Sequence, residues 1–81
     1  MKAKIYINYK EGILDPEGLT VSKALKSIGI KGIKNLSIGK CIELDIDSKT
    51  KNEAIKIIEA SCSKLLANPN TEIYHYEIME N

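Results

Sequence analysis

This sequence predicts an α+β fold. Four segments with strand-like alternation of apolar and polar residues and two segments with helical spacing follow one another in the order β-α-β-β-α-β. That order is typical of the ferredoxin-like sandwich, in which a four-stranded antiparallel sheet carries two helices on one face. The 81 residues are the size of one domain and 43% of them are hydrophobic, so residues 1–81 are expected to form a single domain with a packed core.

The first two elements are predicted by local patterns. Residues 2–9 alternate between apolar and polar side chains, which predicts a half-buried strand. Asp15, Pro16 and Glu17 then combine an N-cap carboxylate, a proline suited to the first turn and an acid near the positive end of a helix dipole. A helix is therefore expected over residues 16–28, with Gly29 as its left-handed stop.

The middle of the chain predicts a β-hairpin. Its strands are expected over residues 33–38 and 41–47, and Gly39-Lys40 is the candidate turn or bulge between them. In the second strand the apolar side chains share one face, and the opposite face is mostly acidic. That second strand is therefore expected to place one side on the core and the other toward solvent or a partner.

A second helix and a last strand complete the predicted order. Thr50 and Glu53 form a capping box that starts the helix, and Asn68-Pro69-Asn70 ends it. The last strand, residues 71–79, has apolar or aromatic side chains on both sides, so either of its faces could be the buried one.

Two helices on one face leave the other face of the sheet bare or paired with another chain. We expect that bare face to contact partner subunits through five residues, Lys4, Tyr6, Asn8, Glu43 and Asp45. One small core contributes only about 3–5 kcal/mol, so association into a homo-oligomer, a dimer or tetramer, would supplement it.

Composition excludes several classes of partner. Twelve Lys+Arg against 11 Asp+Glu leave a net charge of +1, whereas nucleic-acid binders have a clear basic excess and membrane-surface proteins a polybasic cluster. The longest apolar runs span three residues, as at Leu65-Leu66-Ala67, far short of a membrane span, and the first residues lack the apolar stretch of a secretory signal. We expect a cytoplasmic protein that binds neither nucleic acid nor membrane.

The reactive side chains are few. Cys41, Cys62 and His75 are the only thiols and imidazole, and spacing does not exclude a Cys–His pair, although both cysteines lie in core-type patterns. Glu43, Asp45 and Asp47 share one strand face and could gather a hard cation, but alternating acids are more typical of a solvated or partner-facing strand. No catalytic residue, no cofactor and no metal site is therefore predicted.

Several short segments together resemble one family. They are residues 10–18 (KEGILDPEG), Ala24-Leu25, Gly29, Ile38-Gly39-Lys40, Ile42-Glu43-Leu44, Cys62, residues 64–69 (KLLANP) and Tyr76-Glu77-Ile78. Their order and spacing are similar to those of PurS, the small subunit of phosphoribosylformylglycinamidine (FGAM) synthase. The likeness covers nearly the whole chain, and it is carried by the co-occurrence of these segments because each one alone has a capping or packing explanation.

The resemblance implies a role in the fourth step of purine biosynthesis. There a PurL-like synthetase subunit uses ATP to amidate formylglycinamide ribonucleotide (FGAR), and a PurQ-like glutaminase subunit releases the ammonia. The small subunit would carry out neither reaction, and would dock the two enzymes and assist ammonia transfer between them. The alternative is a small ferredoxin-like regulatory module that binds a metabolite.

Overall fold

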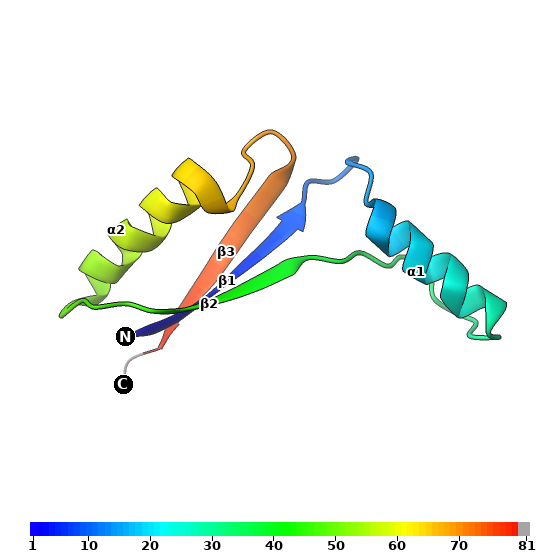
Figure 1. Ribbon diagram of the computed structural model, residues 1–81, viewed down its shortest axis with the longest axis horizontal. Coiled ribbons are helices and arrows are strands. Elements are labelled where there is room, and N and C mark those ends of the chain that lie inside the picture. The colour runs from blue at the N-terminus through cyan, green and yellow to red at the C-terminus, as the bar shows by residue number, and fades with distance from the viewer. Residues whose placement is uncertain (80–81) are drawn as a thin grey trace.

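A computed structural model describes residues 1–79 of the chain as an elongated α+β structure. Figure 1 shows a central sheet with one helix beside it and the other at the far end of the molecule. Along the chain the elements are β1 (Lys2–Tyr9), α1 (Pro16–Ser27), β2 (Lys40–Asp45), α2 (Lys51–Ser61), a π-helical turn (Cys62–Leu66) and β3 (Glu72–Met79).

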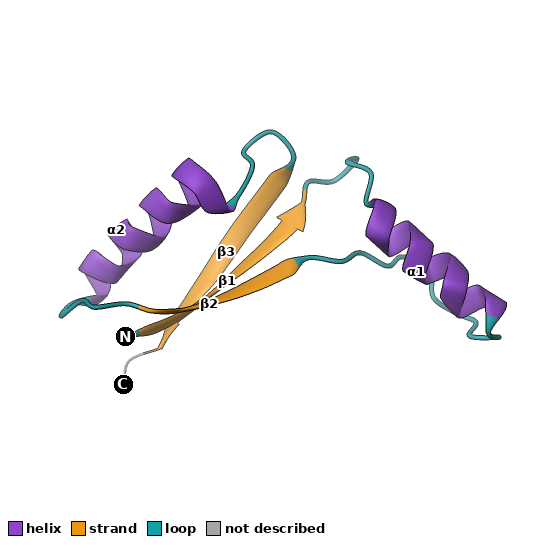
Figure 2. Cartoon of the chain, in the orientation of Figure 1, coloured by secondary structure: helices purple, strands orange, loops and turns teal. Residues whose placement is uncertain are grey.

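The sheet has β1 in its centre. Within the described part of the chain the strand order is β2-β1-β3, and both pairs are antiparallel. The α+β class is confirmed, but the expected four-stranded sheet is wrong for these residues. Residues 33–38 form no strand, because they run back from the tip of α1 and Ile38 donates its backbone N–H to the Asp15 side chain (Figure 2).

The core lies between the sheet and α2. Its most buried side chains are Ala3, Ile5 and Ile7 of β1, Ala54 and Ile58 of α2, and Cys62. In β3 the tyrosines Tyr74 and Tyr76 and also Ile78 pack against this cluster, which decides the question that the sequence left open about this strand.

The expectation that both helices cover one face of the sheet is also wrong. Among residues 1–79, the core cluster includes no side chain of α1. The chain instead extends over 50 × 28 × 14 Å, with α1 directed away from the sheet (Figure 1). We call α1 together with the returning segment 28–39 the arm.

Both predicted helix starts are confirmed. The Asp15 carboxylate accepts the N–H of Gly18 at 2.9 Å, and the Thr50 hydroxyl accepts the N–H of Glu53 at 3.2 Å. Gly29 adopts a φ of +92°, the left-handed conformation expected just after a helix. Short-range capping chemistry therefore sets these boundaries whatever the helices pack against.

Candidate subunit interface

The face of the sheet opposite α2 carries rows of charged and polar side chains. Lys4 of β1 lies between Glu43 of β2 and Glu77 of β3, and Lys2 pairs with Asp45 in the next row. The Lys4 ammonium is 3.9 Å from the Glu43 carboxylate, and both side chains are substantially exposed. An exposed pair of this kind contributes little to stability, so these charges remain available to a partner. We call this surface the open face.

Tyr6 occupies the middle of the open face. Its ring stacks on His75 with the ring centroids 4.9 Å apart and the planes 19° from parallel. Its hydroxyl lies 3.5 Å from a carboxylate oxygen of Glu77, at the long limit of a hydrogen bond. Partial burial, followed by the charge of Glu77, raises the pKa of Tyr6, so its hydroxyl remains a neutral donor.

The five residues predicted for the partner contact all belong to the open face. Lys4, Tyr6 and Asn8 alternate along β1, while Glu43 and Asp45 stand opposite Lys4 and Lys2 on β2. Asn8 lies at the end nearest the arm, where its side-chain oxygen closely approaches Gly39. Their role in binding a partner stays a prediction.

The sequence prediction missed the contribution of β3 to this face. His75 and Glu77 are exposed there, next to Tyr6 and Lys4. The alternation of residues 72–79 places His75 and Glu77 on one side of the strand, but both sides are apolar or aromatic enough to be the buried one. Knowledge of which side packs on α2 was required.

On the covered face, a carboxylate joins α2 to β3. Glu59 accepts hydrogen bonds from the hydroxyls of Tyr74 and Tyr76, with oxygen–oxygen distances of 2.5 and 2.9 Å. The two bonds lower the pKa of Glu59. The bond between Tyr74 and Glu59 also raises the pKa of Tyr74 to about 12. Because the three groups satisfy one another, their contact positions α2 over β1 and β3.

The base of the arm is held by Asp15. Besides capping α1, its carboxylate accepts the N–H of Ile38 at 2.7 Å, 23 residues along the chain. The bonds from Gly18 and then Ile38 lower the pKa of Asp15. At Gly18 an added Cβ would lie only 2.9 Å from the carbonyl oxygen of Leu36, so the helix packs tightly on the returning segment.

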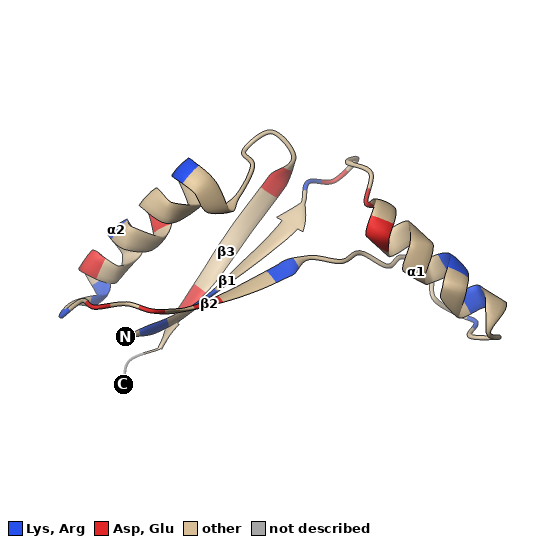
Figure 3. Ribbon diagram, in the orientation of Figure 1, with Lys and Arg blue, Asp and Glu red and all other residues tan. Residues whose placement is uncertain are grey.

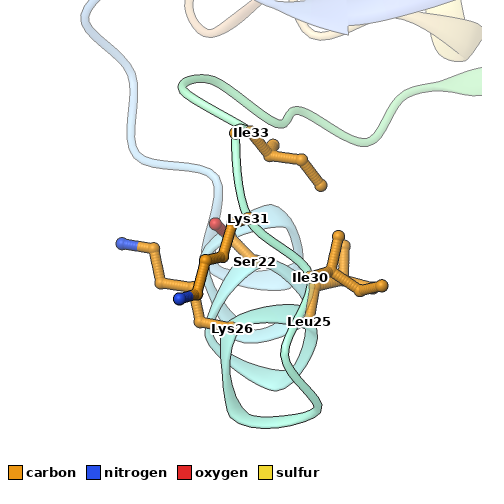
Figure 4. A pocket seen from close by; sticks show the side chains of 7 residues that line it. Ser22, Leu25, Lys26, Ile30, Lys31 and Ile33 are labelled. Carbon is orange, nitrogen blue, oxygen red and sulfur yellow. The ribbon is translucent and has the colours of Figure 1, made fainter.

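The arm exposes a large amount of apolar surface. Its exposed aliphatic side chains are Leu19, Val21, Ile28, Ile30 and Ile33, and Leu14 is exposed just before the helix begins. A hollow of about 310 Å³ lies between α1 and the returning segment, with Leu25 and Ile30 on one side and Lys26 and Lys31 on the other (Figure 4). The acid of α1 is in its first turn and a lysine is in its last, as the colours in Figure 3 show.

The reactive groups considered from sequence do not assemble into a site. Cys62 is buried on the α2 side of the sheet, whereas His75 is exposed on the open face. Cys41 and His75 flank Tyr6 on opposite neighbouring strands, roughly 10 Å apart at two strand spacings. Burial, followed by the charge of Glu59, raises the pKa of the Cys62 thiol and makes it a poor nucleophile.

The acids Glu43, Asp45 and Asp47 are not gathered either. Across residues 1–79, no three His, Cys, Asp or Glu side chains converge in an arrangement that could hold a metal ion. No helix of the described chain is both long and apolar enough to cross a membrane.

The fold and its surfaces define a small α+β protein with one sheet face covered by a helix, an open charged face and a projecting apolar arm. The chain belongs to the PurS family, whose sequence model, described as phosphoribosylformylglycinamidine (FGAM) synthase, matches residues 2–80. The family resemblance found in the sequence is thereby confirmed.

Individual relatives agree in sequence and in structure. Phosphoribosylformylglycinamidine synthase subunit PurS of Archaeoglobus fulgidus is 43% identical over 74 residues, covering 91% of this chain and 92% of the relative. The structure of Bacillus subtilis PurS has a TM-score of 0.86 and 39% identity over 98% of both chains. A chain in the structure of PurLQS from Thermotoga maritima has a TM-score of 0.86 and 32% identity, covering 94% of this chain and 93% of that one.

Proposed function

We propose that this chain is an accessory subunit of FGAM synthase in de novo purine biosynthesis, acting in the cytoplasm. It docks a PurQ-like glutaminase subunit and a PurL-like synthetase subunit, and it assists ammonia transfer between them. The complex converts FGAR and glutamine into FGAM and glutamate with ATP. The chain itself acts as a homo-oligomer and supplies contact surfaces instead of reacting groups.

One observation carries this proposal. The chain matches, over nearly its full length and in both sequence and fold, a chain in the structure of PurLQS from Thermotoga maritima. The curated relatives from Archaeoglobus fulgidus and Bacillus subtilis are likewise named as a subunit of the synthase.

The physical character of the surfaces supports the same role. The open face presents two lysines and three carboxylates that are only weakly paired with one another, which suits recognition of a charged partner surface. Ammonia released into water is diluted and largely protonated, whereas docked subunits shorten its route and exclude solvent. A small subunit that brings two enzymes together can therefore raise the glutamine-dependent rate without any catalytic group of its own.

Reconstitution tests the proposal. Glutaminase and synthetase subunits are mixed with and without this chain, and FGAM formation is measured with glutamine or with an ammonium salt as nitrogen donor. We expect the glutamine-dependent rate to need the chain and the ammonium-dependent rate to change little. Equal glutamine-dependent rates with and without the chain would contradict the proposed function.

Charge reversal locates the contact. The double variant Glu43→Lys/Asp45→Lys should weaken assembly with the two enzymes while its circular dichroism stays that of a folded protein. Glu11→Lys/Glu17→Lys is the matched control, because it makes the same charge change at exposed positions in the loop after β1 and on α1, outside the sheet. If both double variants co-elute with the enzymes as the unmodified chain does, the open face is not the contact.

A further inference from the structure

The arm is a basic part of a chain that is otherwise slightly acidic. Residues 16–39 contain four lysines and one acid, so the arm has a formal charge of +3, and the rest of the chain has a formal charge of −2. Neither of the two ion pairs found within residues 1–79 involves a lysine of the arm. The arm therefore attracts anions that the chain itself does not supply.

Two of these lysines border the hollow of about 310 Å³ between α1 and the returning segment. Lys26 comes from the last turn of α1 and Lys31 from the returning segment. Figure 4 shows the side-chain nitrogens of both lysines and the hydroxyl of Ser22 on one side of this hollow. We call it the arm hollow. Two cations and a hydroxyl donor on one side of a hollow suit a phosphate group.

The donors around the arm hollow are free to bond a ligand. The hydroxyls of Thr20 and Ser27 each donate to a carbonyl oxygen of their own helix, whereas Ser22 forms no such bond within the described residues 1–79. The last carbonyl oxygens of α1, which would repel an anion, accept the N–H groups of residues 28–30. The Ser22 hydroxyl and the two ammonium groups can thus donate to an anion in the hollow.

The opposite side of the arm hollow is apolar. Leu25 and Ile30 lie there together in Figure 4, and Ile33 lies further along the returning segment. Ile30 is 45% exposed, so its side chain is available to pack on a ligand. The volume of about 310 Å³ lies at the lower end of the range of about 300–1,000 Å³ that is typical of small-molecule sites. The hollow thus combines an apolar side with a cationic side at the scale of a small ligand.

We propose that the arm hollow binds a small phosphate monoester that has an apolar body. The phosphate accepts hydrogen bonds from Lys26, Lys31 and Ser22, and the apolar body packs on Leu25 and Ile30. A phosphate monoester has a charge of about −1.5 to −2 at pH 7, which two ammonium groups balance, whereas a carboxylate needs only one of them. The site lies outside the open face, so its ligand binding is measured on the chain without either enzyme subunit.

An NMR titration of the full chain with phenyl phosphate tests the site. We expect the amide signals of residues 22–33 to shift along a saturable curve, and those of the three strands to stay in place. Inorganic phosphate lacks the apolar body and phenol lacks the charge, so each should bind at least about tenfold more weakly. Equal affinity for inorganic phosphate and phenyl phosphate would overturn the proposal, because exposed lysines alone would then explain the binding.

Two double variants separate the arm hollow from the general charge of the arm. Lys26→Gln/Lys31→Gln removes both ammonium groups of the hollow and should weaken phenyl phosphate binding at least about tenfold. Lys23→Gln/Lys34→Gln makes the same charge change on the arm outside the hollow and should bind as the unmodified chain does. All four lysines are exposed, so both variants should fold, with circular dichroism as the check. Equal weakening by the two pairs would overturn the site.

The apolar side of the hollow is tested by Ile30→Ser, which changes a side chain outside the core cluster. This variant should lose several-fold in affinity for phenyl phosphate and should bind inorganic phosphate as the unmodified chain does. Unchanged affinity for phenyl phosphate, or an equal loss for both anions, would overturn the proposal. Since these titrations contain no enzyme subunit and the reconstitution contains no phenyl phosphate, the ligand site and the proposed function fail separately.

Discussion

Replacing Cys62 with serine should strongly destabilise the protein, whereas the same replacement at Cys41 should not. Cys62 is fully buried among Ile5, Ile7, Ala54 and Ile58, where its sulfur acts as a small apolar group. Cys41 is exposed on the open face. The two cysteines therefore allow one chemical change to be compared in a core and in solvent.

The size of the effect follows from burial. A hydroxyl placed in apolar surroundings without a full partner costs about 1–3 kcal/mol, and a single small core contributes about 3–5 kcal/mol in total. Cys62→Ser is thus expected to lower the free energy of unfolding by about 2 kcal/mol, or about 30-fold in the ratio of folded to unfolded protein. Cys62→Ala, which leaves only a small cavity, should cost less than the serine variant.

Urea denaturation followed by circular dichroism, at one protein concentration for all variants, measures these differences. A thiol reagent adds a second readout: Cys41 should react at once, and Cys62 only as fast as the structure opens, because the reagent cannot reach its buried sulfur. Equal unfolding free energies for Cys62→Ser and Cys41→Ser, or immediate labelling of Cys62, would show that the core described between β1 and α2 is wrong.

Two further predictions concern the carboxylates. The hydroxyls of Tyr74 and Tyr76 lower the pKa of Glu59, so the stabilising effect of the Glu59 carboxylate is present above the ordinary carboxyl pKa of about 4.3 and is lost as pH falls through the lowered value. The double variant Tyr74→Phe/Tyr76→Phe should raise the pKa of Glu59 in an NMR titration. An unchanged pKa would refute these hydrogen bonds. In the unmodified chain an ultraviolet titration should show Tyr74 ionising near 12. The variant Asp15→Asn keeps one side-chain oxygen that can accept the helix-cap bond, but it cannot accept bonds from both Gly18 and Ile38. Hydrogen exchange at the Ile38 amide should therefore become faster while α1 remains helical. If the Ile38 amide were protected as well as in the unmodified chain, Asp15 would not be what holds the arm.

Much of the local structure is predictable because it depends on neighbours in the chain. The caps at Asp15 and Thr50, the left-handed Gly29 and the alternation of β1 all involve groups within a few residues of one another. The open-face positions on β1 and β2 follow from the same alternation, since a side chain opposite a buried one must point to the other side.

Other features depended on contacts distant in sequence. The exposure of His75 and Glu77 on the open face depends on the hydrogen bonds from Tyr74 and Tyr76 to Glu59. These bonds hold one side of β3 against α2 and so turn the opposite side outward. The strand expected over residues 33–38 has the right local pattern, but the bond from Ile38 to Asp15, 23 residues away, holds that segment on the arm.

The amino-acid sequence was enough to predict the α+β class, both helix starts, the family and the residues of β1 that are apolar enough to be buried. Three features became known from the folded chain: α1 leaves its own sheet, β2 has no fourth strand beside it within residues 1–79, and a hollow lined by Leu44 and Leu65 lies open between β2 and α2. Hydrophobic patterning specifies which side chains avoid water, but it does not specify which surface covers them.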